Sequence, residues 1–291
     1  GRIRRPAPPA RPARGSPRNQ FRRETPRIAA FLAPNGVSRT PEAEDGRVSI
    51  PDAGEPVPPR VRDLAGDVAL TPVWRNGIGG VTFRTDDGRY LKYGPRNEES
   101  SMAEEAERLA WAGGSVPVPR VLEVGSDEDH EWLVTVALAG ESAVAPRWTI
   151  DSGRCEVAVR AIGRGLRAFH DALPVDSCPF DWSVDARVAN AARRGIRLPA
   201  DLRKAPRIDR AVVCHGDACS PNTILDLEGR ITGHVDLGAL GVADRWADIA
   251  VAAMSTEWNY GPGWEATLLD AYGVAPDPER QEYYRSLWNA T

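Results

Sequence analysis

The apolar pattern of this 291-residue chain changes near Gly140, and that change constrains the fold more than any other feature. Before Gly140, short runs of alternating apolar and polar residues are separated by glycine turns, which is typical of antiparallel strands. After it, apolar residues recur at three-to-four spacing, as in Val159, Ile162 and Leu166, which is typical of amphipathic helices. A β-rich first part and a larger, mainly helical second part are therefore expected.

Turn and cap residues place the individual elements. Glycine turns at 76–80 and 86–88 separate the first three strands, which favours an antiparallel meander. A serine cap with acidic residues behind it predicts the start of the first helix. The expected strands are 73–75, 81–84, 89–93, 120–124, 132–137 and 212–214, with a small hairpin over 223–235. The expected helices are 100–112, 155–173, a short one near 185–194, 244–257, 263–272 and 278–288.

Residues 1–60 differ from the rest of the chain in composition and charge. Proline and arginine recur there without an apolar period, so a disordered arm is expected. The arm carries about twelve arginines against about six acidic residues, whereas the whole chain has a formal net charge of -4. The remainder is therefore acidic, which argues against a nucleic-acid partner and favours a cationic small molecule. A nucleic-acid-binding role for the arm is an alternative, with salt-dependent binding as its signature.

Hydropathy and cysteine spacing bear on membrane insertion, secretion and disulfide content. No run approaches about eighteen apolar residues, so no membrane span and no membrane partner is expected. The arginine-rich N-terminus lacks the apolar core of a secretory signal and is not expected to be one. Four cysteines without regular spacing favour free thiols in a reducing cytoplasm over a disulfide framework.

The stretch from Cys214 to Asn222 carries the most specific chemical signal. It reads Cys-His-Gly-Asp-Ala-Cys-Ser-Pro-Asn, and an Asp-Leu-Gly tripeptide starts at Asp236. A carboxylate five residues before an amide, on a loop after a buried strand, can turn both groups toward one cleft. The hairpin that follows can return a second carboxylate there. Asp217, Asn222 and Asp236 thus predict one site whose oxygen groups suit a divalent cation and a phosphorylated ligand.

The first part of the chain supplies groups that would complete a phosphate site. Lys92 stands at the end of the third strand, where its ammonium can reach phosphates. Glu105 on the next helix can hold Lys92 by an ion pair, although Glu104 and Glu107 compete for that role. Bare backbone amides in the first glycine turn can cover phosphates. The glycines of that turn are Gly77, Gly79 and Gly80. This set of parts is that of a protein-kinase fold.

Structural roles are predicted for several residues near the motif. His215 is expected to bond the loop backbone rather than carry a proton. A thiolate nucleophile at Cys214 is disfavoured because adjacent strand residues point to opposite faces. A zinc site in this stretch is disfavoured because no Cys-x-x-Cys pair is present. Asp244 is expected to cap a helix, and Asp248 to form an ion pair with Arg245.

The pattern His-Gly-Asp-x-x-x-x-Asn followed by Asp-Leu-Gly resembles the motif of the aminoglycoside phosphotransferases. Segments 116–120, 132–135, 178–180 and 241–250 are also similar to that family, and the likeness covers roughly residues 65–290. The 3'- and 3''-type enzymes are most similar, actinobacterial members above all. The resemblance implies a bilobal fold, ATP and Mg2+ as cofactors, and an acidic pocket for an aminoglycoside.

The resemblance also implies a role for each site residue. Asp217 corresponds to the catalytic carboxylate, and Asn222 and Asp236 correspond to the magnesium ligands. Lys92 corresponds to the residue that contacts the phosphates, and Glu105 to the residue that orients it.

The resemblance also predicts adenine contacts, and the sequence departs from the family pattern at three places. Backbone groups from Thr135 to Ala137 are expected to meet the adenine. The loop at 76–80 lacks the serine that many members have, and Ala239 stands where many have a basic residue. The segment 288–291 lacks the acidic residues that bind the drug in well-known 3'-type members. These departures bear on the identity of the substrate.

The predicted fold class is α+β, bilobal and protein-kinase-like. Residues 61–137 are expected to form an N-lobe, with a small antiparallel sheet and one helix, and residues 138–291 a mainly helical C-lobe. The predicted reaction moves the γ-phosphoryl group of ATP to a hydroxyl of an aminoglycoside. One alternative is a kinase for another hydroxyl, such as that of choline, homoserine or a fructosamine. Another is a kinase-fold protein that binds nucleotide or drug without catalysis.

Overall fold

The first described helix, α1 (Pro59–Ala65), precedes a five-stranded antiparallel sheet. The structure is a computed structural model that describes residues 51, 54–97 and 101–291. The predicted arm at 1–60 therefore lies almost entirely outside the described residues. Helix α1 begins two residues before the expected start of the folded chain, and its buried Val61 and Ala65 pack against the sheet.

The sheet has the strand order β1-β2-β3-β5-β4. Its strands are β1 (Leu70–Arg75), β2 (Val81–Thr85), β3 (Arg89–Pro95), β4 (Val121–Ser126) and β5 (His130–Val136). Strand β2 buries Val81, Phe83 and Thr85 and leaves the residues between them more exposed, as a strand with one covered face does. Thr82 pairs with Lys92 across β2 and β3, so the register turns Lys92 away from the face that buries Phe83.

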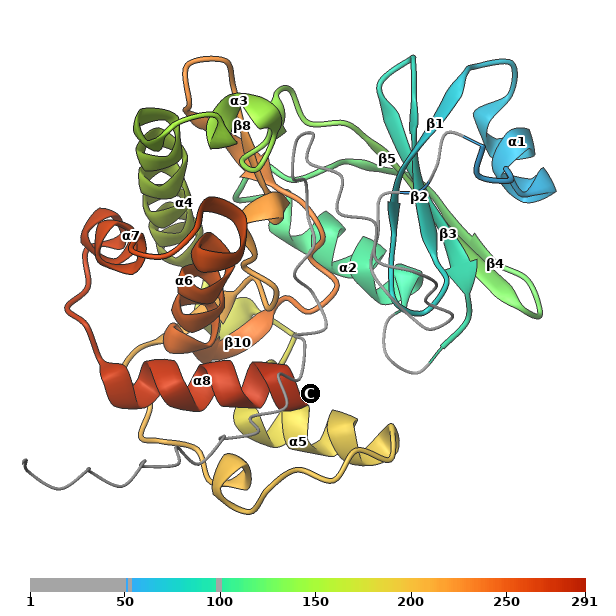
Figure 1. Cartoon of the computed structure of the whole chain (residues 1–291). Helices are drawn as coiled ribbons and strands as arrows, with labels where there is room; N and C mark the ends of the chain where they lie inside the picture. Colours follow the sequence, from blue (N-terminus) through green and yellow to red (C-terminus); the bar gives the residue numbers. More distant parts are fainter. Residues whose placement is uncertain (1–50, 52–53, 98–100) are drawn as a thin grey trace, which may run out of the picture.

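Helix α2 (Met102–Ala112) joins the sheet to the rest of the molecule. Figure 1 shows it between the sheet and the C-terminal elements. Its buried residues Ala106 and Leu109 belong to one apolar cluster with Leu237 and Leu240, which follow Asp236 in the chain. The Nε of Arg108 also donates to the carbonyl of Leu240 (3.1 Å). The position of α2 is therefore tied to the segment that carries Asp236.

The second part is mainly helical, as expected. Its long helices are α4 (Ser152–Ala172), α5 (Val184–Arg193), α6 (Trp246–Tyr260), α7 (Glu265–Tyr272) and α8 (Pro278–Ala290). Short elements accompany them: β6 (Glu141–Ser142), α3 (Pro146–Thr149), β7 (Ala211–Cys214), β8 (Thr223–Leu225), β9 (Ile231–His234) and β10 (Gly241–Asp244). Among the described residues no helix is both long enough and apolar enough to cross a membrane.

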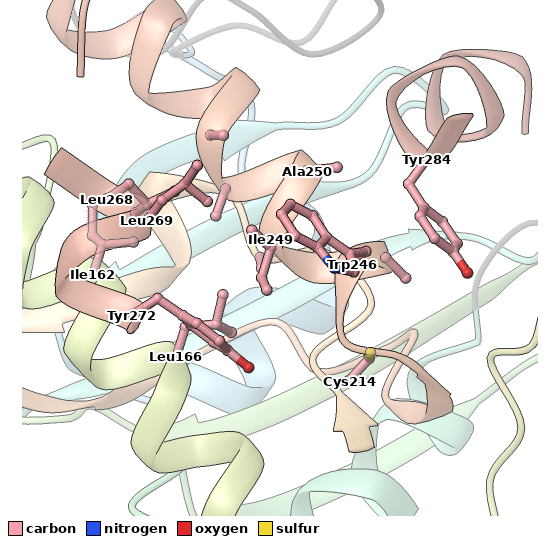
Figure 2. Packing of buried hydrophobic residues seen from close by; sticks show 14 of the residues in the cluster. Ile162, Leu166, Cys214, Trp246, Ile249, Ala250, Leu268, Leu269, Tyr272 and Tyr284 are labelled. Carbon is pink, nitrogen blue, oxygen red and sulfur yellow. The ribbon is translucent and has the colours of Figure 1, made fainter. Parts of the chain in front are cut away.

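Helix α6 lies at the centre of this part, because every residue from Trp246 to Thr256 is buried. Figure 2 shows side chains of α4 and α7 meeting beside it, with Ile162 next to Leu268. A Cβ on Gly163 would lie 2.7 Å from the carbonyl oxygen of Leu268, so only glycine allows α4 and α7 to approach so closely.

Several elements were not predicted, among them α1, β6, α3 and β10, and β10 also changes the start of a predicted helix. Residues 241–244 form strand β10, which pairs antiparallel with β7, and helix α6 begins two residues later than predicted. The segment is a strand because the edge of β7 is available to it, and that edge is brought there by the tertiary fold.

Candidate active site

The loop from β7 to β8 presents Asp217 at a sharp change of chain direction. Gly216 has φ of +86°, and a Cβ there would lie 2.2 Å from the carbonyl oxygen of Ala239. A side chain would be strained by the backbone and would also collide with the segment that carries Asp236. The glycine before Asp217 therefore lets the loop turn and lets the two carboxylate-bearing segments pack together.

A fully buried carboxylate, Asp248 of α6, holds this loop. One of its oxygens accepts the His215 amide (2.6 Å) and the other accepts the Gly216 amide (2.9 Å). The predicted ion pair between Arg245 and Asp248 is wrong, because Arg245 bonds Asp209 at 2.6 Å. Residue 248 lies on the buried side of α6, whereas Arg245 precedes the helix near the surface, so their closeness in sequence does not bring them together.

Two further buried side chains support Asp248. Nε2 of His170 donates to Asp248 (2.9 Å), and Nδ1 of the same ring lies 2.8 Å from the Tyr272 hydroxyl. Because the Asp248 carboxylate can only accept, Nε2 of His170 must carry the proton of this hydrogen bond. Burial by itself would raise the pKa of Asp248, but these bonds and the loop amides outweigh it and hold the pKa below its ordinary value. The carboxylate therefore stays ionised.

Asp217 and Asn222 contact each other directly. The Asn222 side-chain amide donates to the backbone carbonyl of Asp217 (3.0 Å) and to its Oδ2 (3.1 Å). Oδ1 of Asp217 is buried and has no hydrogen-bond partner among the described residues. Burial, and then the nearby charge of Asp236, raise the pKa of Asp217 above its ordinary value. A carboxylate in this state is a better proton acceptor than a solvated one.

Asp236 is returned to the same place by the β8–β9 hairpin. The Val235 amide donates to the carbonyl of Asn222 (3.0 Å), which fixes the end of the hairpin against the start of β8. Asp236 has φ of +66° and is the one non-glycine residue with positive φ in the described structure. Such a conformation costs about 1–3 kcal/mol and persists where surrounding contacts enforce it, often at functional sites.

Lys92 connects the sheet to this group of residues. Its Nζ donates to both oxygens of Glu105 (2.7 and 2.8 Å) and to Oδ1 of Asp236 (2.8 Å). Glu105 is thus the acid of α2 that meets Lys92; Glu104 pairs with Arg108 instead. Burial would lower the pKa of Lys92, but the two carboxylates outweigh it and raise that pKa. The same ammonium lowers the pKa of Asp236.

The donor set fits a divalent cation. Asp236 offers carboxylate oxygens, and Asn222 retains its carboxamide oxygen because its NH2 group faces Asp217. Oxygen ligands of this kind suit Mg2+. The Lys92 ammonium beside Asp236 shows that this place already accommodates positive charge.

The expected nucleotide contacts lie on the sheet. The Gly79 and Gly80 amides bond to Asn76, at 3.3 Å to its carbonyl and 2.6 Å to its side-chain oxygen, and Gly77 is exposed at the same turn. Thr135 lies buried near the end of β5. The Ala137 amide donates to the Gly88 carbonyl (2.8 Å), so that amide is already engaged within the sheet.

The histidine and the cysteine of the motif have structural surroundings. Nδ1 of His215 accepts the Asp217 amide (3.3 Å), as expected of a residue that bonds the loop backbone. Cys214 is fully buried, its Sγ lies 3.4 Å from the Asp244 carbonyl, and burial raises the pKa of its thiol well above the ordinary value. A thiolate nucleophile at this position is therefore disfavoured.

Sequence reasoning missed the positioning residues. His170 carried one signal, a titratable residue directly after Phe169 at the end of the apolar stripe of α4. For Asp248 the sequence predicted an ion pair with Arg245 instead of a role in holding the loop. Asn76 carries no signal in the sequence beyond the glycine turn that it precedes.

Comparison with known proteins agrees with this geometry. The sequence model of the phosphotransferase enzyme family matches residues 79–284. The chain is 40% identical over 228 residues to an aminoglycoside 3'-phosphotransferase of Streptomyces fradiae, covering 68% of this chain and 84% of the relative. It is 33% identical over 264 residues to a streptomycin 3''-kinase of Streptomyces griseus, covering 79% and 94%.

Solved structures show the same relationship. The crystal structure of a type VIII aminoglycoside-3'-phosphotransferase superposes with a TM-score of 0.67 at 31% identity, covering 80% of this chain and 97% of that one. APH(3'')-Id from Streptomyces rimosus, in complex with ADP and streptomycin, superposes with a TM-score of 0.62 at 28% identity, covering 79% and 96%. The predicted bilobal, kinase-like α+β fold is thus confirmed. The chain belongs to the aminoglycoside phosphotransferase family.

Proposed function

We propose that this enzyme transfers the γ-phosphoryl group of ATP to a hydroxyl group of an aminoglycoside antibiotic. The observation that carries the proposal is the set of contacts among five side chains. Lys92 of the sheet reaches Glu105 and Asp236, and Asn222 reaches Asp217. The streptomycin 3''-kinase and the complex of a related enzyme with ADP and streptomycin support the choice of nucleotide and acceptor.

In this mechanism Asp217 acts on the acceptor hydroxyl. Its Oδ2 is held by Asn222, whereas its buried Oδ1 has no hydrogen-bond partner among the described residues and is the oxygen proposed to accept the proton of a substrate hydroxyl. Phosphoryl transfer depends chiefly on position and charge, so the main task of Asp217 is to orient the hydroxyl toward the phosphorus. Its raised pKa helps it to take up the proton as the new bond forms.

Asn222 and Asp236 are the residues that would hold Mg2+, and a bound Mg2+ would shield charge on the phosphates. Lys92 is proposed to contact the phosphates, because its ammonium lies beside Asp236. Glu105 keeps Lys92 extended in that direction. The lysine therefore neutralises charge at the same place as the cation.

The remaining contacts concern the nucleotide and the acceptor. We place Gly77, Gly79 and Gly80 over the phosphates and the segment from Thr135 to Ala137 beside the adenine. Because the Ala137 amide is bonded to Gly88, adenine recognition there uses other backbone groups. The net negative charge of the chain outside its arginine-rich arm favours a polycationic acceptor.

A coupled ADP-release assay with Asp217→Asn tests the proposal. The acceptors are kanamycin, neomycin and streptomycin, with choline and homoserine as metabolite controls. We expect wild-type turnover with at least one aminoglycoside and a fall in kcat of about 10²–10⁴ in the variant. ATP affinity by calorimetry should stay within about threefold of wild type.

The matched control is Asp226→Asn, in the exposed turn of the same β8–β9 hairpin, where Asp226 pairs with Arg230. This variant should keep full turnover. Normal turnover by Asp217→Asn would remove Asp217 from the mechanism, and turnover with choline or homoserine alone would replace the aminoglycoside as the acceptor.

A further inference from the structure

The side chain of Asn76 lies inside the glycine turn that joins β1 to β2. Its Oδ1 accepts the Gly80 amide (2.6 Å) and the Ile78 amide (3.2 Å). The Gly79 amide donates to the backbone carbonyl of Asn76 (3.3 Å), and the Asn76 amide donates to the carbonyl of Gly80 (2.9 Å). Three successive amides of the turn are therefore directed at one residue.

Close packing of glycines brings the Asn76 carboxamide against the backbone of the turn. A Cβ on Gly80 would lie 2.7 Å from Nδ2 of Asn76, and a Cβ on Gly94 of β3 would lie 2.7 Å from Cα of Gly80. Glycine at position 80 makes room for the carboxamide, and glycine at position 94 lets β3 approach Gly80. Gly79, with φ of +89°, completes the tight turn.

Amides that converge on one oxygen form a concavity that attracts anions. In a phosphate-covering turn, these amides are the groups that would otherwise bind phosphate oxygens. Here a neutral carboxamide oxygen already accepts the amides of Ile78 and Gly80. The turn also lacks a hydroxyl side chain, since residues 77–80 read Gly-Ile-Gly-Gly.

We propose that Asn76 is a built-in competitor of the nucleotide phosphates and sets the affinity of this enzyme for ATP. This inference rests on the proposed function, because it requires ATP to lie under the turn. On nucleotide binding, phosphate oxygens exchange with the Asn76 oxygen for the Ile78 and Gly80 amides. Part of the phosphate binding energy is spent in displacing Asn76, so the protein binds ATP less tightly than an unoccupied turn would.

The experiment measures dissociation constants for ATP and for adenosine by calorimetry at saturating Mg2+, with wild-type protein, Asn76→Ala and Asn76→Asp. Alanine removes the competing oxygen but keeps the two backbone bonds of residue 76. Aspartate keeps the acceptor and adds negative charge beside the phosphates. Asp87→Ala is the matched control, since Asp87 bonds Thr85 and Arg89 in the turn at the opposite end of β2.

We expect Asn76→Ala to bind ATP about threefold to tenfold more tightly than wild type. Asn76→Asp should bind ATP at least about tenfold more weakly, because a charged acceptor holds the amides more firmly and repels phosphate. Adenosine affinity should not change in either variant, because adenosine lacks phosphates. Asp87→Ala should match wild type with both ligands.

The outcomes that would contradict the role of Asn76 differ from the outcome that would contradict the proposed function. If wild type binds ATP but Asn76→Ala binds it equally or more weakly, Asn76 supports the turn and does not compete. Equal ATP affinity of Asn76→Asp and wild type would overturn the inference even if the alanine variant did not fold. If wild type itself fails to bind ATP, the proposed function fails first.

Discussion

Asp248→Asn is the sharpest test of how the catalytic loop is held. The side chains of Asp248 and His170 are both 0% exposed, and the two oxygens of Asp248 accept three N–H donors. Asparagine has one oxygen, so in either orientation its NH2 group faces at least one N–H donor. A hydrogen bond to a charged group contributes about 1.5–3 kcal/mol, and a buried unpaired donor costs about 1–3 kcal/mol. Together these two costs predict that the free energy of unfolding falls by about 2.5–6 kcal/mol.

Thermal unfolding and turnover measure the effect. At about 2–4 °C for each kcal/mol, the melting temperature should fall by on the order of 10 °C. Turnover should fall as well, because the backbone of His215 and Gly216 loses the anchor that positions Asp217. Arg245→Ala is the control: its partner Asp209 is partly exposed, so the loss should stay below about 1 kcal/mol.

The reasoning is refuted if Asp248→Asn melts within about 2 °C of wild type with unchanged kcat. It is also refuted if Arg245→Ala loses as much stability as Asp248→Asn. The pH dependence gives a second check. The folded-state pKa of Asp248 is lowered, so its contribution is present at neutral pH and is lost as pH falls below about 3.9, the ordinary value. The stability difference between wild type and variant should therefore narrow in acid.

Three further predictions concern the site itself. Glu105→Gln should lower kcat/KM for ATP at least about tenfold in steady-state assays, because Lys92 loses a charged partner. Glu104→Gln, at an exposed position of the same helix, should match wild type. Equal effects of the two substitutions would contradict the choice of Glu105. EDTA should abolish turnover and Mg2+ should restore it, and activity in EDTA would remove Asp236 from the role of metal ligand. The pKa of Asp217 is raised above the ordinary aspartate value of about 3.9. As pH falls, kcat/KM should therefore begin to decline at a pH above that value, because Asp217 becomes protonated. A pH–rate profile with no acidic decline would count against Asp217 as proton acceptor.

Local sequence pattern predicted the parts of this fold that depend on neighbouring residues. The apolar stripe of α4, the serine cap of α2 and the glycine turns of the sheet are properties of short segments, and each element appears close to its expected bounds. The spacing of Asp217, Asn222 and Asp236 also carried information, since a loop and a hairpin of fixed length can return to only a few places.

Other features were decided by the tertiary structure. Strand β10 exists because β7 offers it an edge, which no property of residues 241–244 reveals. Asp248 binds the loop rather than Arg245 because α6 is buried at the centre of the second part and turns that carboxylate inward. The Asn76 side chain fits against Gly80 because that residue has no Cβ, and Gly94 on another strand lets β3 approach Gly80 closely. Periodicity and spacing determine which element a residue belongs to, but the partner of a buried polar group depends on packing between segments far apart in the chain.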